Sequence, residues 1–165
     1  MSVCVVDVET TGVSAWSRVV EIGAALVDSD AVFATLCCPD VFDERAERAL
    51  AYNGIAYADV LAAPPVSNIR EVWRDWLRVN GVTEMWAYSR GFDRTMLERD
   101  AFAAPWHVDG GSVLALAREH MPWRPKDPSL GDAAEFFLGV RPARAHRALD
   151  DARTAAQVLA VLRRL

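Results

Sequence analysis

Two carboxylates stand two positions apart, in Asp7-Val8-Glu9, at the end of the first apolar run of the chain. On a strand, residues at this spacing face the same side, so the two side chains would lie next to each other. Neighbouring carboxylates resist joint ionisation unless a cation lies between them, and oxygen ligands suit Mg²⁺ or Mn²⁺. For a lone Asp-x-Glu motif, however, two acids that emerge into water at a strand end are the favoured interpretation.

Two further acids stand where helices are expected to begin. Asp93 follows an apolar run and a short loop, and Asp151 comes five residues after His146. Each acid alone is explained by the helix macrodipole, which favours negative charge at a helix N-terminus, and His146 alone by a place on the surface. An imidazole, with an unperturbed pKa of about 6.5, can also accept a proton at neutral pH. Asp150 would point elsewhere on its helix, and we assign it no metal role.

In combination, these segments resemble the three motifs of the DnaQ-like exonuclease superfamily. The motifs are Asp7-Val8-Glu9-Thr10-Thr11-Gly12, Phe92-Asp93 with Leu97 after it, and His146 with Asp151. The histidine is typical of the DEDDh branch, since members with tyrosine place it where this chain has Arg147. The resemblance spans residues 3–162, and further segments match in order and spacing: Val20-Glu21-Ile22-Gly23-Ala24, Asn53-Gly54-Ile55 and Ala63-Pro64-Pro65.

The resemblance implies a 3′→5′ exonuclease that hydrolyses single-stranded DNA or RNA ends to nucleoside 5′-monophosphates. Relatives use two divalent cations, Mg²⁺ or Mn²⁺, and a histidine general base. Asp7, Glu9 and Asp151 would hold the first ion, while Asp7 and Asp93 would hold the second. His146 would accept a proton from the attacking water.

The resemblance also implies contacts to the terminal nucleotide, from Thr10, Thr11, Gly12, Ser89, Phe92 and Trp16. The Thr-Thr-Gly turn matches the segment that receives the 3′-terminal sugar. Phe92 is either an apolar wall for the terminal base or a core residue, with equal support for each. Trp16 could stack on the base, although ordinary packing is the favoured interpretation. Ser89 stands where many relatives carry Asn, which shortens the reach of its hydrogen bond.

Strand patterns come first along the chain, and helix patterns then alternate with a strand. Apolar runs predict strands at 3–8, 19–28, 31–37 and 84–88. Helices are predicted at 44–52, at about 67–79 with Ser67 or Asn68 as its cap, at 92–100, at 113–120 capped by Ser112, at 130–138 closed by Gly139, and at 149–163. We therefore expect one exonuclease domain, residues 1–165, with an α/β fold that resembles ribonuclease H: a five-stranded mixed sheet, strands one to three antiparallel, flanked by helices.

The composition is that of an ordinary globular domain, with 52% hydrophobic and 25% charged residues. No apolar run reaches the roughly 20 residues of a membrane span, and the N-terminus lacks a secretory pattern. With three cysteines that suit free thiols, this predicts a cytoplasmic protein without a membrane partner. The net charge of −5 argues against a nucleic-acid partner, but it is only −1 once the four acids are assigned to metal ions.

The sequence leaves several alternatives open. DNA and RNA are close to even as substrates, because no segment reads the sugar. The chain ends with its last expected helix, which favours a stand-alone trimming enzyme over a polymerase proofreading accessory subunit. A module that binds 3′ ends without cleaving them, and a structural role with incidental acids, are less favoured. A homodimer is left open.

Overall fold

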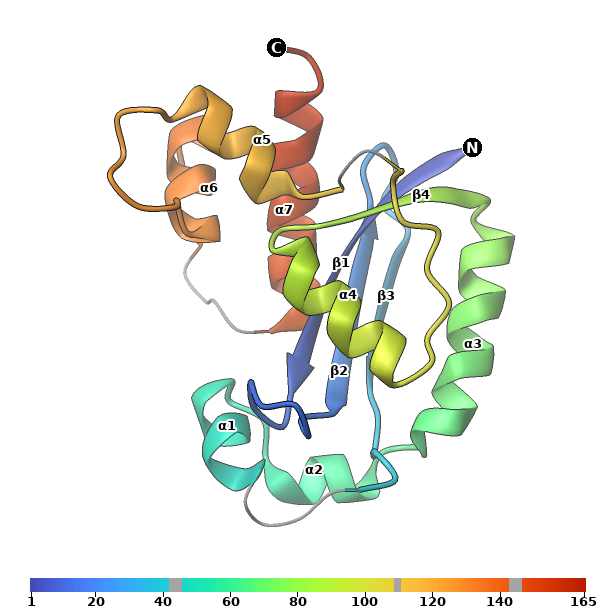
Figure 1. Cartoon of the computed structure of the whole chain (residues 1–165). Coiled ribbons are helices and arrows are strands. Elements are labelled where there is room, and N and C mark those ends of the chain that lie inside the picture. The colour runs from blue at the N-terminus through green and yellow to red at the C-terminus, as the bar shows by residue number, and fades with distance from the viewer. Residues whose placement is uncertain (42–45, 109–110, 143–146) are drawn as a thin grey trace.

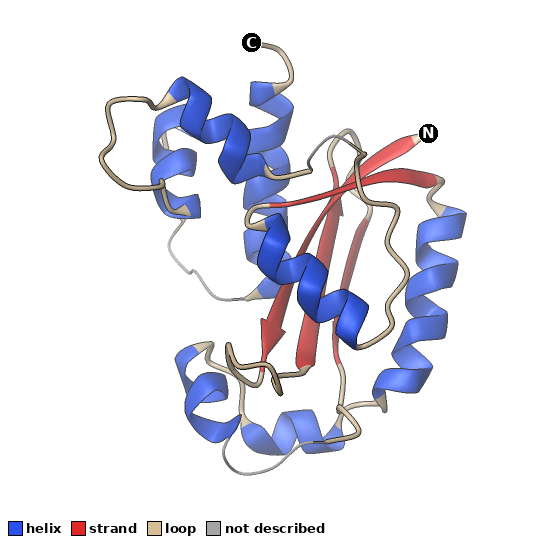
Figure 2. Cartoon of the chain, in the orientation of Figure 1, coloured by secondary structure: helices blue, strands red, loops and turns tan. Residues whose placement is uncertain are grey.

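The computed structural model describes residues 1–41, 46–108, 111–142 and 147–165 (Figure 1). These residues form one sheet of four strands: β1 (Ser2–Thr10), β2 (Val19–Leu26), β3 (Val32–Leu36) and β4 (Val82–Ala87). The strands lie in the order β3-β2-β1-β4, with β1 to β3 antiparallel and β4 parallel to β1. The predicted α/β fold with a mixed sheet between helices is confirmed (Figure 2).

The described residues form four strands, so the prediction of five is wrong. The segment that follows Phe102 begins to pair with β4 at Met85, whose N–H donates to the Pro105 carbonyl. The next such bond, from the Ala87 N–H, goes to the Gly111 carbonyl. Between these two bonds β4 advances by two residues, from Met85 to Ala87, but the facing segment advances by six, from Pro105 to Gly111. The described residues therefore form isolated bridges instead of a fifth strand.

The described ranges contain seven helices: α1 (Glu47–Tyr52), α2 (Tyr57–Ala62), α3 (Val66–Val79), α4 (Arg90–Arg99), α5 (Val113–His120), α6 (Leu130–Leu138) and α7 (Ala148–Leu162). The short α2 was not predicted, and residues 44 and 45 of the first predicted helix lie outside the described residues. Two predicted ends are confirmed, because Ser112 accepts the Ala115 N–H and Gly139 ends α6 with a φ of 73°. None of these helices is long and apolar enough to cross a membrane.

The start of α3 differs from the prediction, since neither Ser67 nor Asn68 is its N-cap. Pro65 occupies that position with a φ of −54°, and no side-chain hydrogen bond caps the helix. A proline ring already fixes φ close to the helical value, and its missing N–H costs nothing at a helix start. The helix can therefore begin immediately after the proline pair.

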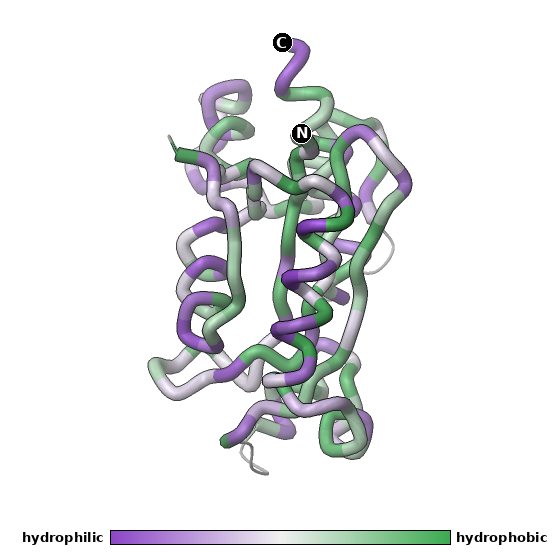
Figure 3. The backbone as a smooth tube through the Cα atoms, turned by 90° about the vertical axis from the view of Figure 1, so that its right-hand side faces the viewer, coloured by the Kyte–Doolittle hydropathy of each residue, from purple (hydrophilic) through white to green (hydrophobic). Residues whose placement is uncertain are grey.

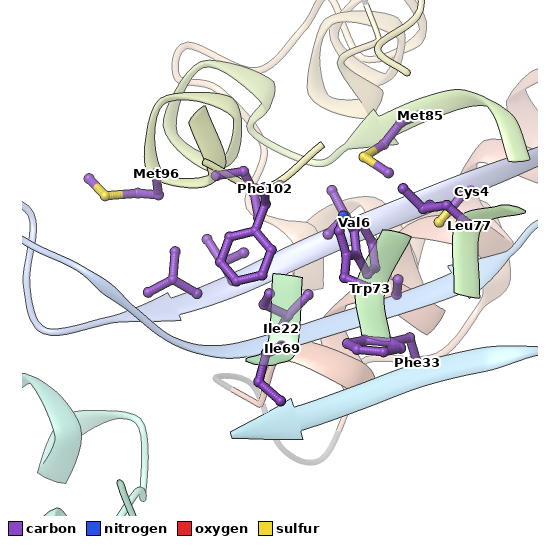
Figure 4. Packing of buried hydrophobic residues seen from close by; sticks show 14 of the residues in the cluster. Cys4, Val6, Ile22, Phe33, Ile69, Trp73, Leu77, Met85, Met96 and Phe102 are labelled. Atoms are coloured by element: carbon purple, nitrogen blue, oxygen red, sulfur yellow. The ribbon is translucent and has the colours of Figure 1, made fainter. Parts of the chain in front are cut away.

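Side chains of β1 alternate between two apolar clusters, one on each face of the sheet. On one face, Cys4, Val6 and Val8 pack with residues of α3 and α4 around the fully buried Trp73 (Figure 4). On the other face, Val5 packs with residues of α5, α6 and α7. Hydrophilic and hydrophobic residues alternate along the helices, as expected where one side meets the sheet (Figure 3). Positions 7 and 9, which share the face of Val5, therefore point to the α7 side.

Candidate active site

The C-terminal end of β1 carries two acids on the face that α7 covers. Asp7 is half-buried and Glu9 is 8% exposed. Both carboxylates meet that of Asp151, with one oxygen from each residue within 4.8 Å of the others. The arrowhead of β1 accordingly lies beside the first turn of α7 (Figure 1). Three acids from two elements thus come within reach of a single cation.

Gly23 explains why α7 comes so close to the sheet. It is the cross-strand partner of Asp7, and a Cβ atom there would lie 2.1 Å from backbone atoms of Ala148 and Leu149. Only a residue without a side chain leaves room for the backbone of the first helical turn. Since Asp151 belongs to that turn, the missing side chain on β2 places it against Asp7.

Asp93 reaches the same place from α4 and is 3% exposed. The last pair between β1 and β4 is Val6 with Ala87, so β4 offers no strand partner to the N–H of Val8. The Asp93 carboxylate accepts that N–H, with 3.3 Å between N and Oδ1. Asp93 also lines the same pocket as the other three acids. We refer to these four residues as the acid cluster: Asp7, Glu9, Asp93 and Asp151.

Three members of the acid cluster, Asp7, Glu9 and Asp93, hold protons more tightly than isolated acids do. Burial, followed by the charges of the other three acids and of Glu21, raises the pKa of Asp7 well above its usual value. Burial, with the charge of Glu21 next in size, raises the pKa of Glu9 to about 8, and burial raises the pKa of Asp93 to about 7. A divalent cation would displace these protons, and an all-oxygen donor set is what Mg²⁺ or Mn²⁺ prefers. The acid cluster therefore fits such ions.

An open pocket of about 240 Å³ lies over the acid cluster. Its lining includes Ser89 and Phe92, which were predicted as substrate contacts, together with Tyr88 and Leu130. Phe92 is half-buried, lines this pocket and also packs against the core, while its contact with a terminal base stays a prediction. The Tyr88 hydroxyl donates to the Pro128 carbonyl at 2.7 Å, which fixes this side of the pocket.

The turn at Thr10, Thr11 and Gly12 begins a loop, residues 11–18, that is closed by its own hydrogen bonds. Thr10 Oγ1 donates to the Gly12 carbonyl at 2.6 Å, and Thr11 Oγ1 accepts the Arg18 N–H at 3.0 Å. The hydroxyls of Thr10 and Thr11, which belong to the turn predicted to receive the 3′-terminal sugar, are thus engaged within the loop. The turn gives shape to the loop, with Gly12 at a φ of 146°.

This loop is fixed from α4 but leaves Trp16 in solvent. Arg99 Nη1 donates to the carbonyls of Ser14 and Ser17, at 3.2 and 3.1 Å. Trp16 is 83% exposed, so the packing interpretation that the sequence favoured is wrong. Polar groups and Arg99 already close the loop, and no indole is required to fill it. An indole in this position can stack on a nucleobase.

His146 lies outside the described residues, so its role stays a prediction. Sequence reasoning gave no role to two neighbours of the acid cluster, Glu21 and Arg147. Glu21 is 5% exposed, and its carboxylate accepts hydrogen bonds from the Arg147 guanidinium. A signal for Glu21 did exist, because it is the charged residue in a strand whose eight residues are all buried. A buried charge requires a partner.

The chain belongs to the RNase T exonuclease family, whose model matches residues 4–159. This confirms the predicted resemblance to the DEDDh exonucleases, with their ribonuclease H-like fold, and identifies the chain as an exonuclease-family nuclease domain. No curated protein matches the chain significantly.

Solved structures with this fold include several nucleases. Exonuclease X in complex with 5′-overhanging duplex DNA is 20% identical with a TM-score of 0.67, over 98% of this chain and 91% of that one. The nuclease domain of 3′hExo, a DEDDh family member bound to rAMP, is 14% identical with a TM-score of 0.76, over 99% and 92%. Cell-death related nuclease 4 is 19% identical with a TM-score of 0.73, and this chain spans 64% of its length. At these identities the likeness shows a shared fold.

Proposed function

We propose that this protein is a metal-dependent 3′→5′ exonuclease that releases nucleoside 5′-monophosphates from single-stranded nucleic acid ends, with residues 1–165 acting as one domain. The observation that carries the proposal is the acid cluster, in which the carboxylates of Asp7, Glu9 and Asp151 lie within 4.8 Å of one another. A phosphodiester is an anion, so it can approach four acids only when cations offset their charge. Membership of an exonuclease family supports the same interpretation.

The acid cluster would hold two divalent cations, Mg²⁺ or Mn²⁺. When bound, such ions lower the pKa of a coordinated water and offset the charge that builds on the scissile phosphate. Asp7 would be shared between them, because its carboxylate lies within 4.8 Å of those of Glu9 and Asp151 and, after burial, the charge of Asp93 is the largest of those that raise its pKa. The Asp93 carboxylate, fixed by the Val8 N–H, would then complete the set.

The remaining roles belong to the protein's own side chains. His146 would accept a proton from the attacking water, a role that rests on the family motif. The terminal nucleotide must be unstacked to enter the pocket, which favours single-stranded or frayed ends. Phe92 would contact the terminal base from the pocket wall, with Ser89 beside it, and the exposed Trp16 would stack on a base. Thr10, Thr11 and Gly12 would act by shaping the loop that presents Trp16.

Digestion of 5′-labelled single-stranded RNA and DNA of matched sequence, with Mg²⁺ or Mn²⁺, tests the proposal. We expect a ladder that shortens from the 3′ end, and the faster polymer identifies the substrate class. Asp151→Asn and His146→Ala should abolish the ladder. Asp150→Asn is the matched control, because it removes an exposed acid next in sequence to Asp151 and should leave cleavage intact. If the protein binds Mn²⁺ but cleaves neither polymer, the exonuclease proposal is wrong and the protein is better described as a module that binds 3′ ends.

A further inference from the structure

Glu21 is a fifth carboxylate next to the acid cluster, and its negative charge adds to the repulsion among the four acids. It is the cross-strand partner of Glu9, so both side chains point to the α7 face of the sheet. Its charge is the largest influence after burial on the raised pKa of Glu9. An acid in this position needs a fixed partner, since a buried carboxylate without one is costly.

Arg147 is that partner, and its guanidinium binds the Glu21 carboxylate in a bidentate geometry. Its Nη2 lies 2.5 Å from Oε1 of Glu21, and its Nε lies 3.1 Å from both carboxylate oxygens. Such paired N–H···O contacts fix the orientation of a guanidinium as well as its distance. Arg147 is itself 46% exposed along its side chain, whereas that of Glu21 is 6% exposed. The arginine therefore neutralises a buried acid from the protein surface.

The same carboxylate also holds the first turn of α7. Arg147 is the N-cap residue of this helix, and no side chain of its own caps the N-terminus. The first helical N–H, that of Ala148, donates to Oε2 of Glu21 at 3.2 Å. Glu21 thus satisfies a backbone group that a helix start otherwise leaves without a partner, and its charge suits that end of the helix.

These contacts connect β2 to the turn that carries Asp151. The ligands Asp7, Glu9 and Asp151 come from β1 and α7, and the position of α7 against the sheet depends on two residues of β2. Gly23 permits the close approach, and Glu21 fixes it through Arg147 and Ala148. A shift of this turn would separate the Asp151 carboxylate from those of Asp7 and Glu9.

We propose that Glu21 and Arg147 are positioning residues that hold Asp151 against Asp7 and Glu9 and thereby set the affinity of the site for its divalent cation. The proposal rests on the proposed function, since it concerns the same cation site. A positioning role and a purely electrostatic role of Arg147 predict opposite changes in cation affinity when this residue is replaced. Loss of the positive charge of Arg147 should tighten cation binding by Coulomb's law, whereas loss of its positioning contacts should weaken binding.

Calorimetric titration of the purified chain with Mn²⁺, in the absence of nucleic acid, distinguishes the two roles. In Arg147→Met we expect the Kd for Mn²⁺ to rise about tenfold, as when partners that orient metal ligands are removed. Arg147→Lys keeps the charge but loses the bidentate geometry, so a smaller rise is expected. Adding Glu21→Gln to Arg147→Met should cause little further loss, because the two residues act as one unit.

Arg94→Met is the matched control. Arg94 also stands beside an acid of the cluster in sequence, and its Nε lies 2.6 Å from a carboxylate oxygen of Glu98, but the Glu98 side chain is 53% exposed whereas that of Glu21 is 6% exposed. Its Kd should stay within about twofold of the parent chain, as for an ordinary surface pair. Melting temperatures identify any variant that fails to fold, and Arg147→Lys then serves in its place.

The outcomes separate the inference from the function on which it rests. An Arg147→Met chain, or Arg147→Lys if that variant does not fold, that binds Mn²⁺ as tightly as the parent or more tightly overturns the positioning role and leaves the exonuclease intact. A parent chain that binds no Mn²⁺ overturns both. As a second readout, raising the Mn²⁺ concentration should restore most of the turnover lost in Arg147→Met, with KM for the nucleic acid unchanged.

Discussion

The acid cluster and the loop of residues 11–18 border the same end of β1, yet the structure holds them in different ways. In the acid cluster, Asp93 and Glu9 are 3% and 8% exposed, and their positions depend on the packing of α4 and α7 against the sheet. The loop is closed by hydrogen bonds of its own and by Arg99, and its Trp16 is 83% exposed. Substitutions in the cluster should therefore change stability and chemistry together, whereas substitutions in the loop should change substrate binding alone.

Asp93→Asn should give the largest effect on catalysis. Asparagine keeps an oxygen that can accept the Val8 N–H, so the local structure should survive while the charge is lost. Nuclease activity should fall on the order of 10³-fold, since cation binding supplies several kcal/mol to the transition state. In the presence of a chelator the melting temperature should stay constant or rise, because a buried charge has been removed. Rates and circular dichroism melts measure the two quantities, and a large loss of metal-free stability would make Asp93 a structural residue.

Gly23→Ala tests whether the position of the cluster depends on the core. The added Cβ would lie 2.1 Å from the backbone of α7, and backbone atoms cannot move aside cheaply. We expect a loss of about 3 kcal/mol in the free energy of unfolding, with weaker Mn²⁺ binding as α7 shifts. Gly91→Ala is the control, because its Cβ would meet nothing within 4 Å and should be neutral or slightly stabilising. Urea denaturation measures both variants, and equal stabilities would show that α7 tolerates a larger spacing.

The four acids could be selected from the sequence through the resemblance of their combined motifs to the DnaQ-like exonucleases, since each motif alone has an ordinary explanation. The two-residue period of a strand placed Asp7 and Glu9 on one face, and helix-start preferences marked Asp93 and Asp151. The strand and helix order followed from apolar patterns in the same way. What these rules cannot give is the approach between segments far apart in the chain.

The residues that set this approach escaped sequence reasoning for a physical reason. Glu21 and Arg147 are 126 positions apart, and nothing local to either one indicates the other. In the sequence Gly23 is an ordinary small residue of an apolar strand, and its importance is evident only from its contact with the backbone of α7 in the structure. Likewise, no local pattern indicates that the N–H groups of Met85 and Ala87 donate to Pro105 and Gly111, six residues apart, so that the described residues form no fifth strand.

The pH dependence of stability should separate the cluster from the loop without any substitution. The pKa values of Glu9 and Asp93 rise to about 8 and about 7 in the folded chain, from 4.5 and 3.8. A raised carboxyl pKa contributes stability that is complete below the unfolded value and is lost as pH rises through the folded value. Without metal, the melting temperature should thus fall by roughly 5 °C or more from about pH 5 to about pH 9.

Millimolar Mg²⁺ should remove most of this decline, because the ionised acids then bind the cation. The decline should also be smaller in Asp93→Asn, which lacks one of the titrating groups. Melting curves recorded with chelator and with Mg²⁺ supply the comparison. A melting temperature that is independent of pH in the presence of chelator would contradict the raised pKa values and the interpretation of the cluster as a cation site.

Trp16→Ala should give the smallest effect and the one confined to the loop. If the exposed indole stacks on a base of the substrate, KM for a single-stranded oligonucleotide should rise about tenfold, while kcat stays constant. The melting temperature should not change, because the ring buries little surface. Trp123→Ala provides the control, since Trp123 is also 62% exposed but packs against Phe136 at 5.2 Å between ring centres. A rise of KM in Trp123→Ala and not in Trp16→Ala would indicate that the oligonucleotide passes over α6. The loop of residues 11–18 would then have no part in binding substrate.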